Sequence, residues 1–267
     1  MTDLRNFVIS STNPCLIIFL IDQSGSMSDK FGNATHTKSQ EVADAINELI
    51  WETGLRCSVG NDVKNRFEIA LIGYGKENNV QSGWEGALLN KWVVSIKNIF
   101  EYPLKEEDGK PVWISPVASG STPMTKAFQN AKHLCQDWIN WGNHKECHPP
   151  IIINITDGEA TDGGNNYQSL INEVNELKQL RTNYGLVNVL NIHISEKISD
   201  RVLFPNEVDS LNNKFSRLLF DMSTPLNENM VRIALQKGYN IANNPKGYIY
   251  NGNAVDLINF LNIGTPQ

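Results

Sequence analysis

Residues 16–27 read LIIFLIDQSGSM, an apolar run that stops at a carboxylate and is followed by two hydroxyls. Such a run is typical of a strand buried on both faces, as in parallel sheets. Ligands of open α/β sheets bind at the carboxyl ends of the strands, which is where Asp22, Ser24 and Ser26 are expected. Carboxylate and hydroxyl oxygens are the ligands that Mg²⁺ and Mn²⁺ prefer. One aspartate neutralises only half of a divalent charge, so we expect further ligands from elsewhere in the chain.

The composition is that of a globular protein with room for a full core. The 267 residues are 40% hydrophobic and 19% charged, and the formal net charge is −6. A chain of this length is ordinary for one α/β domain, so we expect a single domain over 1–267 with its core at about 14–265. The negative charge does not attract nucleic acid or an anionic membrane, and we expect neither as a partner.

Neither targeting signals nor disulfides are indicated. No apolar run approaches the roughly 20 residues needed to cross a bilayer. The first apolar run ends at Asp22, and no small-residue cleavage site follows it. The four cysteines include no C-x-x-C pair and do not suggest a disulfide framework. We therefore expect a reduced, cytoplasmic protein.

Patterns typical of strands and helices alternate along the chain. Apolar runs predict strands at 15–21, 67–74, 151–156, 186–194 and 248–250. Helical spacing of apolar residues predicts helices at 39–51, 124–141, 167–180, 208–220, 230–237 and 254–261. Strands separated by helices predict an α/β fold with a doubly wound, mostly parallel sheet and helices on both faces.

An insertion at about 76–116 interrupts this alternation. We interpret 84–99 as a β excursion that covers the sheet edge, and the charged residues 101–111 as a surface loop. Trp84, Trp92 and Trp113 lie around the excursion, and we expect core or edge-covering roles for them.

Three loops carry the residues suited to metal chemistry. They are residues 22–26, 120–124 and 156–158, with the sequences DQSGS, GSTPM and TDG. The first and third each follow an apolar strand, and the second begins a helix. Right-handed crossovers place all three at the same edge of a parallel sheet.

In this order the three loops resemble the metal-ion-dependent adhesion site of von Willebrand factor A (vWA) domains. The pattern is D-x-S-x-S, then a threonine followed by proline, then the aspartate of T-D-G. The resemblance covers about 14–265 and is to compact intracellular bacterial members, through GYG at 73–75, PVW at 111–113, PIIINITDGE at 150–159 and FLNIGT at 260–265. It implies a Rossmann-like vWA fold. Ser121 departs from the pattern, because relatives often carry glycine there, and would stiffen the second loop.

The resemblance also implies a set of ligands for Mg²⁺ or Mn²⁺. Asp22, Ser24 and Ser26 would hold the metal from the first loop. Thr122 and Asp157 would join directly or through water. The family pattern leaves one coordination position for the carboxylate of a partner protein.

The chemistry of such a site favours a carboxylate-bearing partner. Mg²⁺ takes six oxygens and keeps several waters. The hydroxyls are neutral, so the formal charge of the site comes from Asp22 and Asp157. If Asp157 acts through water, the directly bound ligands leave a net positive charge, and an incoming Glu or Asp completes both the octahedron and the charge balance.

The resemblance implies a non-catalytic adaptor that binds another protein. Similar bacterial proteins are encoded with protein kinases, metal-dependent phosphatases or ATPases in stress, signalling or defence operons, so a product of the same operon is the expected partner. Two alternatives stay open: a metal-dependent hydrolase or phosphatase that uses Asp22, and a domain whose metal site is vestigial. The phosphatase is disfavoured because the second aspartate it normally has at i+2 is Ser24 here.

Two further features have competing interpretations. Thr122 before Pro123 is also the pattern of a helix N-cap, so its hydroxyl could serve the helix in place of a metal. Residues 157–163 superficially resemble a calcium loop, but the glycine required at its sixth position is Asp162. We interpret Glu159 and Asp162 as solvated loop acids.

A zinc site is the remaining alternative. The residues that suggest one are His133, Cys135, His144, Cys147 and His148. Their spacing matches no familiar Cys/His module, and Cys135 falls on the apolar stripe of the helix at 124–141. We therefore favour core packing for the cysteines and exposed positions for the histidines.

Overall fold

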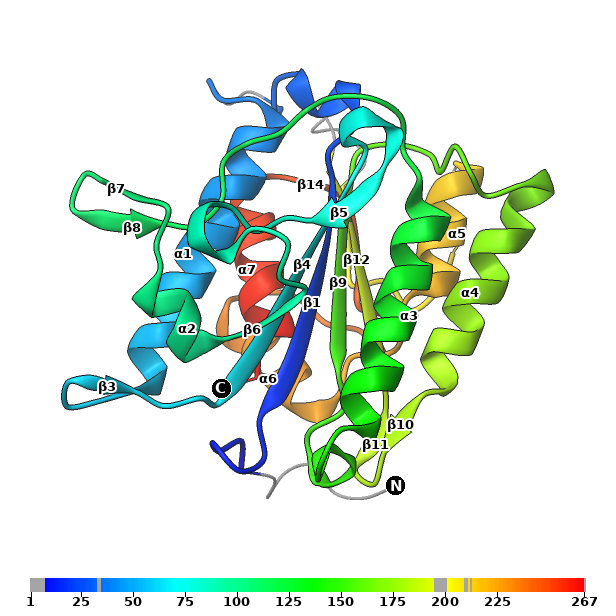
Figure 1. Cartoon of the computed structure of the whole chain (residues 1–267). Coiled ribbons are helices and arrows are strands. Elements are labelled where there is room, and N and C mark those ends of the chain that lie inside the picture. Colours follow the sequence, from blue (N-terminus) through cyan, green and yellow to red (C-terminus); the bar gives the residue numbers. More distant parts are fainter. Residues whose placement is uncertain (1–7, 33–34, 195–200, 209–210, 212, 267) are drawn as a thin grey trace.

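A central sheet with helices on both faces organises the chain (Figure 1). The computed structural model describes residues 8–32, 35–194, 201–208, 211 and 213–266. The described residues form an eight-stranded sheet with the path β13-β14-β12-β9-β1-β4-β5, and β6 also pairs with β4. The parallel strands are β1 (Cys15–Asp22), β4 (Phe67–Tyr74), β9 (Ile151–Thr156), β12 (Asn188–Ile194) and β14 (Tyr248–Gly252). The antiparallel edges are β13 (Val202–Leu203), β5 (Val80–Ser82) and β6 (Val93–Ser95).

The helices divide between the two faces. One face carries α1 (Lys38–Cys57), α2 (Ile96–Glu101), α6 (Glu228–Gln236) and α7 (Ala254–Gly264). The other carries α3 (Met124–Asn140), α4 (Gln168–Gln179) and α5 (Lys214–Met222). Short two-stranded pairs lie outside the sheet, namely β2 (Ser58–Val59) with β3 (Asp62–Val63), β7 (Lys105–Glu107) with β8 (Lys110–Val112), and β10 (Arg181–Thr182) with β11 (Gly185–Leu186).

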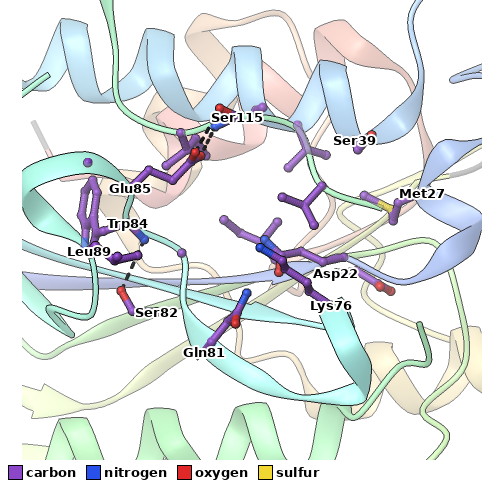
Figure 2. Close-up of a pocket in the computed structure, with 18 of the residues that line it drawn as sticks. Asp22, Met27, Ser39, Lys76, Gln81, Ser82, Trp84, Glu85, Leu89 and Ser115 are labelled. Atoms are coloured by element: carbon purple, nitrogen blue, oxygen red, sulfur yellow. Dashed lines mark hydrogen bonds between the residues drawn. The ribbon is translucent and has the colours of Figure 1, made fainter. Parts of the chain in front are cut away.

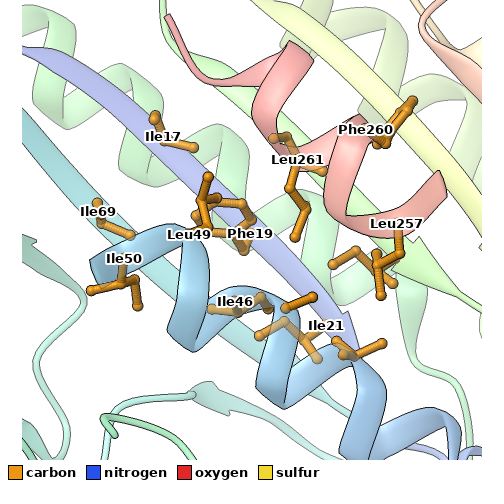
Figure 3. Close-up of a cluster of buried hydrophobic side chains, with 14 of the residues drawn as sticks. Ile17, Phe19, Ile21, Ile46, Leu49, Ile50, Ile69, Leu257, Phe260 and Leu261 are labelled. Carbon is orange, nitrogen blue, oxygen red and sulfur yellow. The ribbon is translucent and has the colours of Figure 1, made fainter. Parts of the chain in front are cut away.

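Strand β1 lies at the centre of the fold. Every one of its residues is buried, and it pairs with β4 on one side and β9 on the other. Its side chains alternate between the two faces. Ile17, Phe19 and Ile21 belong to the core beneath α1 and α7 (Figure 3). Ile18 and Leu20 belong to the core beneath α3 on the opposite face. This two-sided burial explains the unbroken apolar run.

One row of hydrogen-bonded polar side chains runs across this apolar sheet. Asn154, in the middle of β9, is fully buried and accepts a hydrogen bond from the Tyr74 hydroxyl at 2.8 Å. The Asn154 amide donates to Asn191 Oδ1 at 3.0 Å, and Asn191 in turn donates to Ser223 Oγ at 2.9 Å. These bonds satisfy amides that would otherwise be costly to bury.

The predicted fold class is confirmed, and most predicted elements are present within a few residues. Two interpretations in the insertion were wrong. Residues 84–99 contain a 3-10 turn at Gly86–Leu88 and one short strand, β6. Ser95, the last residue of β6, caps helix α2 by accepting a bond from Asn98 N. Residues 101–111 are not a plain loop, because β7 and β8 pair as a hairpin there.

Outside the insertion, the structure changes the limits of several elements. Helix α1 extends to Cys57, well beyond the predicted end. Helix α5 begins at Lys214, where Asn213 caps its first amides. Part of the predicted helix at 208–220 lies outside the described residues. Within the described chain, no helix combines the length and apolar character needed to cross a bilayer.

Candidate metal centre

The three loops identified from the sequence are tied together by backbone hydrogen bonds. Gly25 N donates to Gly120 O at 3.0 Å, and Ser119 N donates to Gln23 O at 2.6 Å. Thr161 N donates to Thr122 O at 2.9 Å, which ties the second loop to the loop after β9. The loops therefore form one assembly at the carboxyl edge of the sheet.

Close backbone approach makes glycine necessary at two positions beside the first loop. Gly75 has φ +134°, and a Cβ there would lie 2.5 Å from Ser24 N. Gly120 has φ +82°, and a Cβ there would lie 2.2 Å from Gly75 O. Any side chain at either position would push the loops apart.

Asp22 is the buried carboxylate of this assembly, with 0% of the residue exposed. Its Oδ1 accepts a hydrogen bond from Ser24 N at 2.9 Å, and its Oδ2 accepts one from Thr156 Oγ1 at 2.6 Å. Burial raises the pKa of Asp22 to about 6, although the hydrogen bonds from Ser24 and Thr156 oppose that shift. A cation beside this carboxylate would stabilise its charged form.

Hydroxyl groups from the first two loops lie beside Asp157 and Gly158 in the third. Ser24 Oγ lies 3.2 Å from Ser26 Oγ, and Ser26 Oγ donates to Asp157 Oδ1 at 2.8 Å. A Cβ built on Gly158 would lie 3.9 Å from Thr122 Oγ1 and 4.0 Å from Ser26 Oγ, so both hydroxyls flank this glycine. The structure thus brings all five sequence-predicted residues to one edge of the sheet.

A lysine that the sequence did not single out also belongs to the assembly. Lys38 Nζ lies 2.8 Å from Asp157 Oδ2, and the side chains are only 6% and 1% exposed. The same ammonium lies 3.8 Å from Asp29 Oδ2 and 3.5 Å from Ser26 O. A lysine in the first turn of a helix opposes the helix dipole, and this anomaly was a usable signal for a nearby carboxylate.

The alternative in which Thr122 caps α3 was wrong, and so was the interpretation of Asp162 as a solvated loop acid. The N-cap residue of α3 is Pro123, which supplies no side-chain hydrogen bond. The Asp162 carboxylate instead accepts bonds from Thr125 N and Lys126 N at 2.9 and 3.0 Å. The Thr122 hydroxyl is therefore not used to cap α3.

Glu159 is exposed, as expected of a loop acid, and its carboxylate also accepts a hydrogen bond from the Tyr167 hydroxyl. That bond raises the pKa of Tyr167 to about 12. Both loop acids therefore have structural roles that residue type alone did not indicate.

The order of the strands and the position of the loops together decide the fold. From β4 through β1, β9 and β12 to β14 the strands run parallel, and antiparallel β5 and β6 lie beyond β4. D-x-S-x-S follows the central strand, a threonine precedes α3, and T-D-G ends the neighbouring strand. The chain has the fold of a von Willebrand factor A domain.

Solved structures of similar fold come from several organisms. Manganese-loaded TRAP from Plasmodium vivax is 14% identical with a TM-score of 0.46, covering 95% of this chain and 73% of that one. A von Willebrand factor type A structure from Catenulispora acidiphila is 15% identical with a TM-score of 0.41, covering 67% and 33%. The PilB minor pilin from Streptococcus sanguinis is 11% identical with a TM-score of 0.49, covering 94% and 60%. No family model and no curated protein matches the chain.

The donor set at the edge of this vWA fold fits a hard divalent cation. It consists of oxygen atoms alone, from two carboxylates and three hydroxyls, and one carboxylate is fully buried. Mg²⁺ and Mn²⁺ accept such ligands, whereas zinc favours nitrogen and sulfur. In the described part of the chain, no group of three or more His, Cys, Asp or Glu side chains is arranged to hold a metal ion.

The residues that suggested zinc have other surroundings. All four cysteines are free and buried, and Cys135 packs in the core beneath α3. The expectation of exposed histidines was wrong for His148, which is 7% exposed and lies 3.6 Å from Cys15 Sγ. Burial lowers the pKa of His148 to about 4.

A cavity of about 310 Å³ lies beside the loop at 22–26 (Figure 2). The end of β1, the start of α1 and the insertion enclose it. Glu85 spans one side, where its carboxylate accepts bonds from Ser115 N at 2.5 Å and Ser115 Oγ at 3.2 Å. Trp84 and Trp113 are buried as expected, whereas Trp92 is 37% exposed.

Proposed function

We propose that this chain is a divalent-metal-dependent binding domain that captures a Glu or Asp side chain of a partner protein. The observation that carries the proposal is the buried Asp22 carboxylate, held beside hydroxyls from two loops and a second carboxylate from a third. Asp22, Ser24 and Ser26 hold the Mg²⁺ or Mn²⁺, and Thr122 and Asp157 act directly or through water. The metal supplies a positive centre that accepts an oxygen ligand.

Exposure at the site is compatible with a protein partner. Asp22, Ser24 and Thr122 are buried, whereas Ser26 is exposed. A ligand that arrives from solvent therefore approaches from the side of Ser26. When Asp157 acts through water, the one directly bound carboxylate and the neutral hydroxyls leave a divalent ion positively charged, so a partner carboxylate is preferred over a neutral oxygen.

Metal binding is tested first by thermal melts with Mn²⁺ and with a chelator. Wild-type protein at 100 times the metal dissociation constant gains about 2.7 kcal/mol of stability, whereas Asp22→Asn gains nothing. Asp256→Asn is the matched control, because Asp256 is also buried but caps α7. A wild-type melt that does not respond to Mn²⁺ would favour the vestigial site.

Partner capture then tests the function. The first partners to test are kinases, phosphatases or ATPases encoded beside this chain, as the resemblance to bacterial adaptors implies. Immobilised wild-type protein should retain its partner in Mg²⁺ and release it in chelator, and Asp22→Asn should not capture it. If the partner is retained equally with and without chelator, and equally by wild type and Asp22→Asn, the proposal is contradicted. Phosphoester hydrolysis that Asp22→Asn abolishes would support the hydrolase instead.

A further inference from the structure

The ion pair between Lys38 and Asp157 places a fixed positive charge inside the candidate metal centre. Both side chains are almost completely buried, and Nζ lies 2.8 Å from Oδ2. The other carboxylate oxygen of Asp157 accepts the hydrogen bond from Ser26 Oγ. Asp157 is therefore oriented by one ligand hydroxyl and neutralised by one ammonium.

Formal charges show what this lysine changes. Asp22 and Asp157 contribute −2 and Lys38 contributes +1, so these three buried groups sum to −1. Asp29, 3.8 Å from the same ammonium, is 53% exposed, so solvent screens its charge and it is left out of the sum. A divalent ion then raises the total to +1, and one partner carboxylate returns it to zero. Without Lys38, the two aspartates alone would neutralise the ion and leave no charge for the partner.

We infer that Lys38 weakens the hold of this site on metal and preserves the positive charge that a partner carboxylate neutralises. This inference rests on the proposed function. The ammonium repels the metal, and the carboxylate relieves that repulsion when it binds. Metal and carboxylate therefore bind cooperatively, and each raises the affinity for the other by the same factor.

Direct measurement of Mn²⁺ binding tests the role of Lys38. Electron paramagnetic resonance counts free Mn²⁺ in titrations of wild type, Lys38→Met and Lys38→Gln. Removal of one nearby positive charge should tighten Mn²⁺ binding by about tenfold or more. Lys132→Met is the matched control, since Lys132 is also largely buried and pairs with Glu173 and Glu176 on α4, at 2.5 and 2.6 Å. Its Mn²⁺ affinity should equal that of wild type.

Acetate provides the carboxylate arm of the same experiment. Added acetate should tighten Mn²⁺ binding in wild type and in Lys132→Met, and should do so less in both Lys38 variants. Thermal melts report folding separately: without metal the Lys38 variants melt lower, because the Asp157 charge is left without its ammonium. Mn²⁺ should then raise their melting temperatures by more than it raises that of wild type.

The outcomes separate this inference from the proposed function. If wild type binds Mn²⁺ and both Lys38 variants bind it equally or more weakly, the inference is overturned while the metal site stands. If neither wild type nor any variant binds Mn²⁺, both fail. Lys38→Met and Lys38→Gln both remove the charge but differ in polarity, so the test can still be made if one of them does not fold.

Discussion

The Thr156 hydroxyl donates a hydrogen bond to Asp22 Oδ2 at 2.6 Å, and this bond links the ends of the neighbouring strands β9 and β1. Thr156 is fully buried, so its hydroxyl has little access to water. It holds the carboxylate that we propose binds metal, and hydrogen-bond partners of metal ligands commonly orient those ligands.

Thr156→Val should therefore weaken Mn²⁺ binding while the fold persists. Loss of an outer hydrogen-bond partner costs about 10–100-fold in metal affinity. The measurement is a Mn²⁺ titration monitored by calorimetry. Thr182→Val is the control, because Thr182 is also buried but lies in β10. Equal affinities in Thr156→Val and wild type would show that this bond does not support the site.

Asp162→Ala should destabilise the protein by about 1 kcal/mol, as the loss of a helix cap does. The Asp162 carboxylate accepts bonds from two amides at the start of α3, and its charge favours the positive end of that helix. Urea unfolding followed by circular dichroism measures the change. Asp137→Ala, at an exposed position on the same helix, should have little effect. The same stability loss in both variants would argue against capping.

Asn154→Leu should lower the unfolding free energy by about 2 kcal/mol or more, although leucine and asparagine have side chains of similar size. Asn191 loses the amide that donates to its Oδ1, and the Tyr74 hydroxyl loses its nearest acceptor. Burial keeps water from replacing either bond. Chemical denaturation is the measurement, and Asn172→Leu on the exposed face of α4 is the comparison. If Asn154→Leu left the unfolding free energy unchanged, the row of hydrogen-bonded polar side chains would add no stability.

His148 should make the protein less stable in mild acid. Burial lowers its pKa from 6.5 to about 4, so between these values the unfolded chain binds a proton that the folded chain does not. Stability therefore falls as the pH drops from 6.5 towards 4, by about 3 kcal/mol in total for this group. Unfolding free energies over this range should decline less steeply in His148→Gln. The exposed His133→Gln should follow wild type, and parallel curves for all three proteins would contradict the prediction.

The sequence alone was sufficient for the parallel strands of the sheet and for the position of the three loops at its edge, but not for the edge strands β5 and β13. Residues 15–21 form an unbroken apolar run, and residues 151–156 form a mostly apolar run interrupted by Asn154, because both strands are buried on both faces, and that burial leaves a local signature. Once the strands are parallel, Asp22 and Asp157 must lie at the same edge. The helix at 96–101 escaped prediction because it is short and begins at a single capping serine.

Tertiary structure alone decided that Lys38 pairs with Asp157 and that Asp162 caps α3. Lys38 and Asp157 are 119 residues apart, and Asp162 caps a helix that starts more than 30 residues earlier. No periodicity encodes such contacts, because a charged side chain pairs with whatever carboxylate the packed elements bring within reach. The burial pattern of a strand or helix is a property of a short segment, and the sequence determines it. The net charge of the candidate metal centre depends on one long-range ion pair, which exists only after α1 has packed against the sheet.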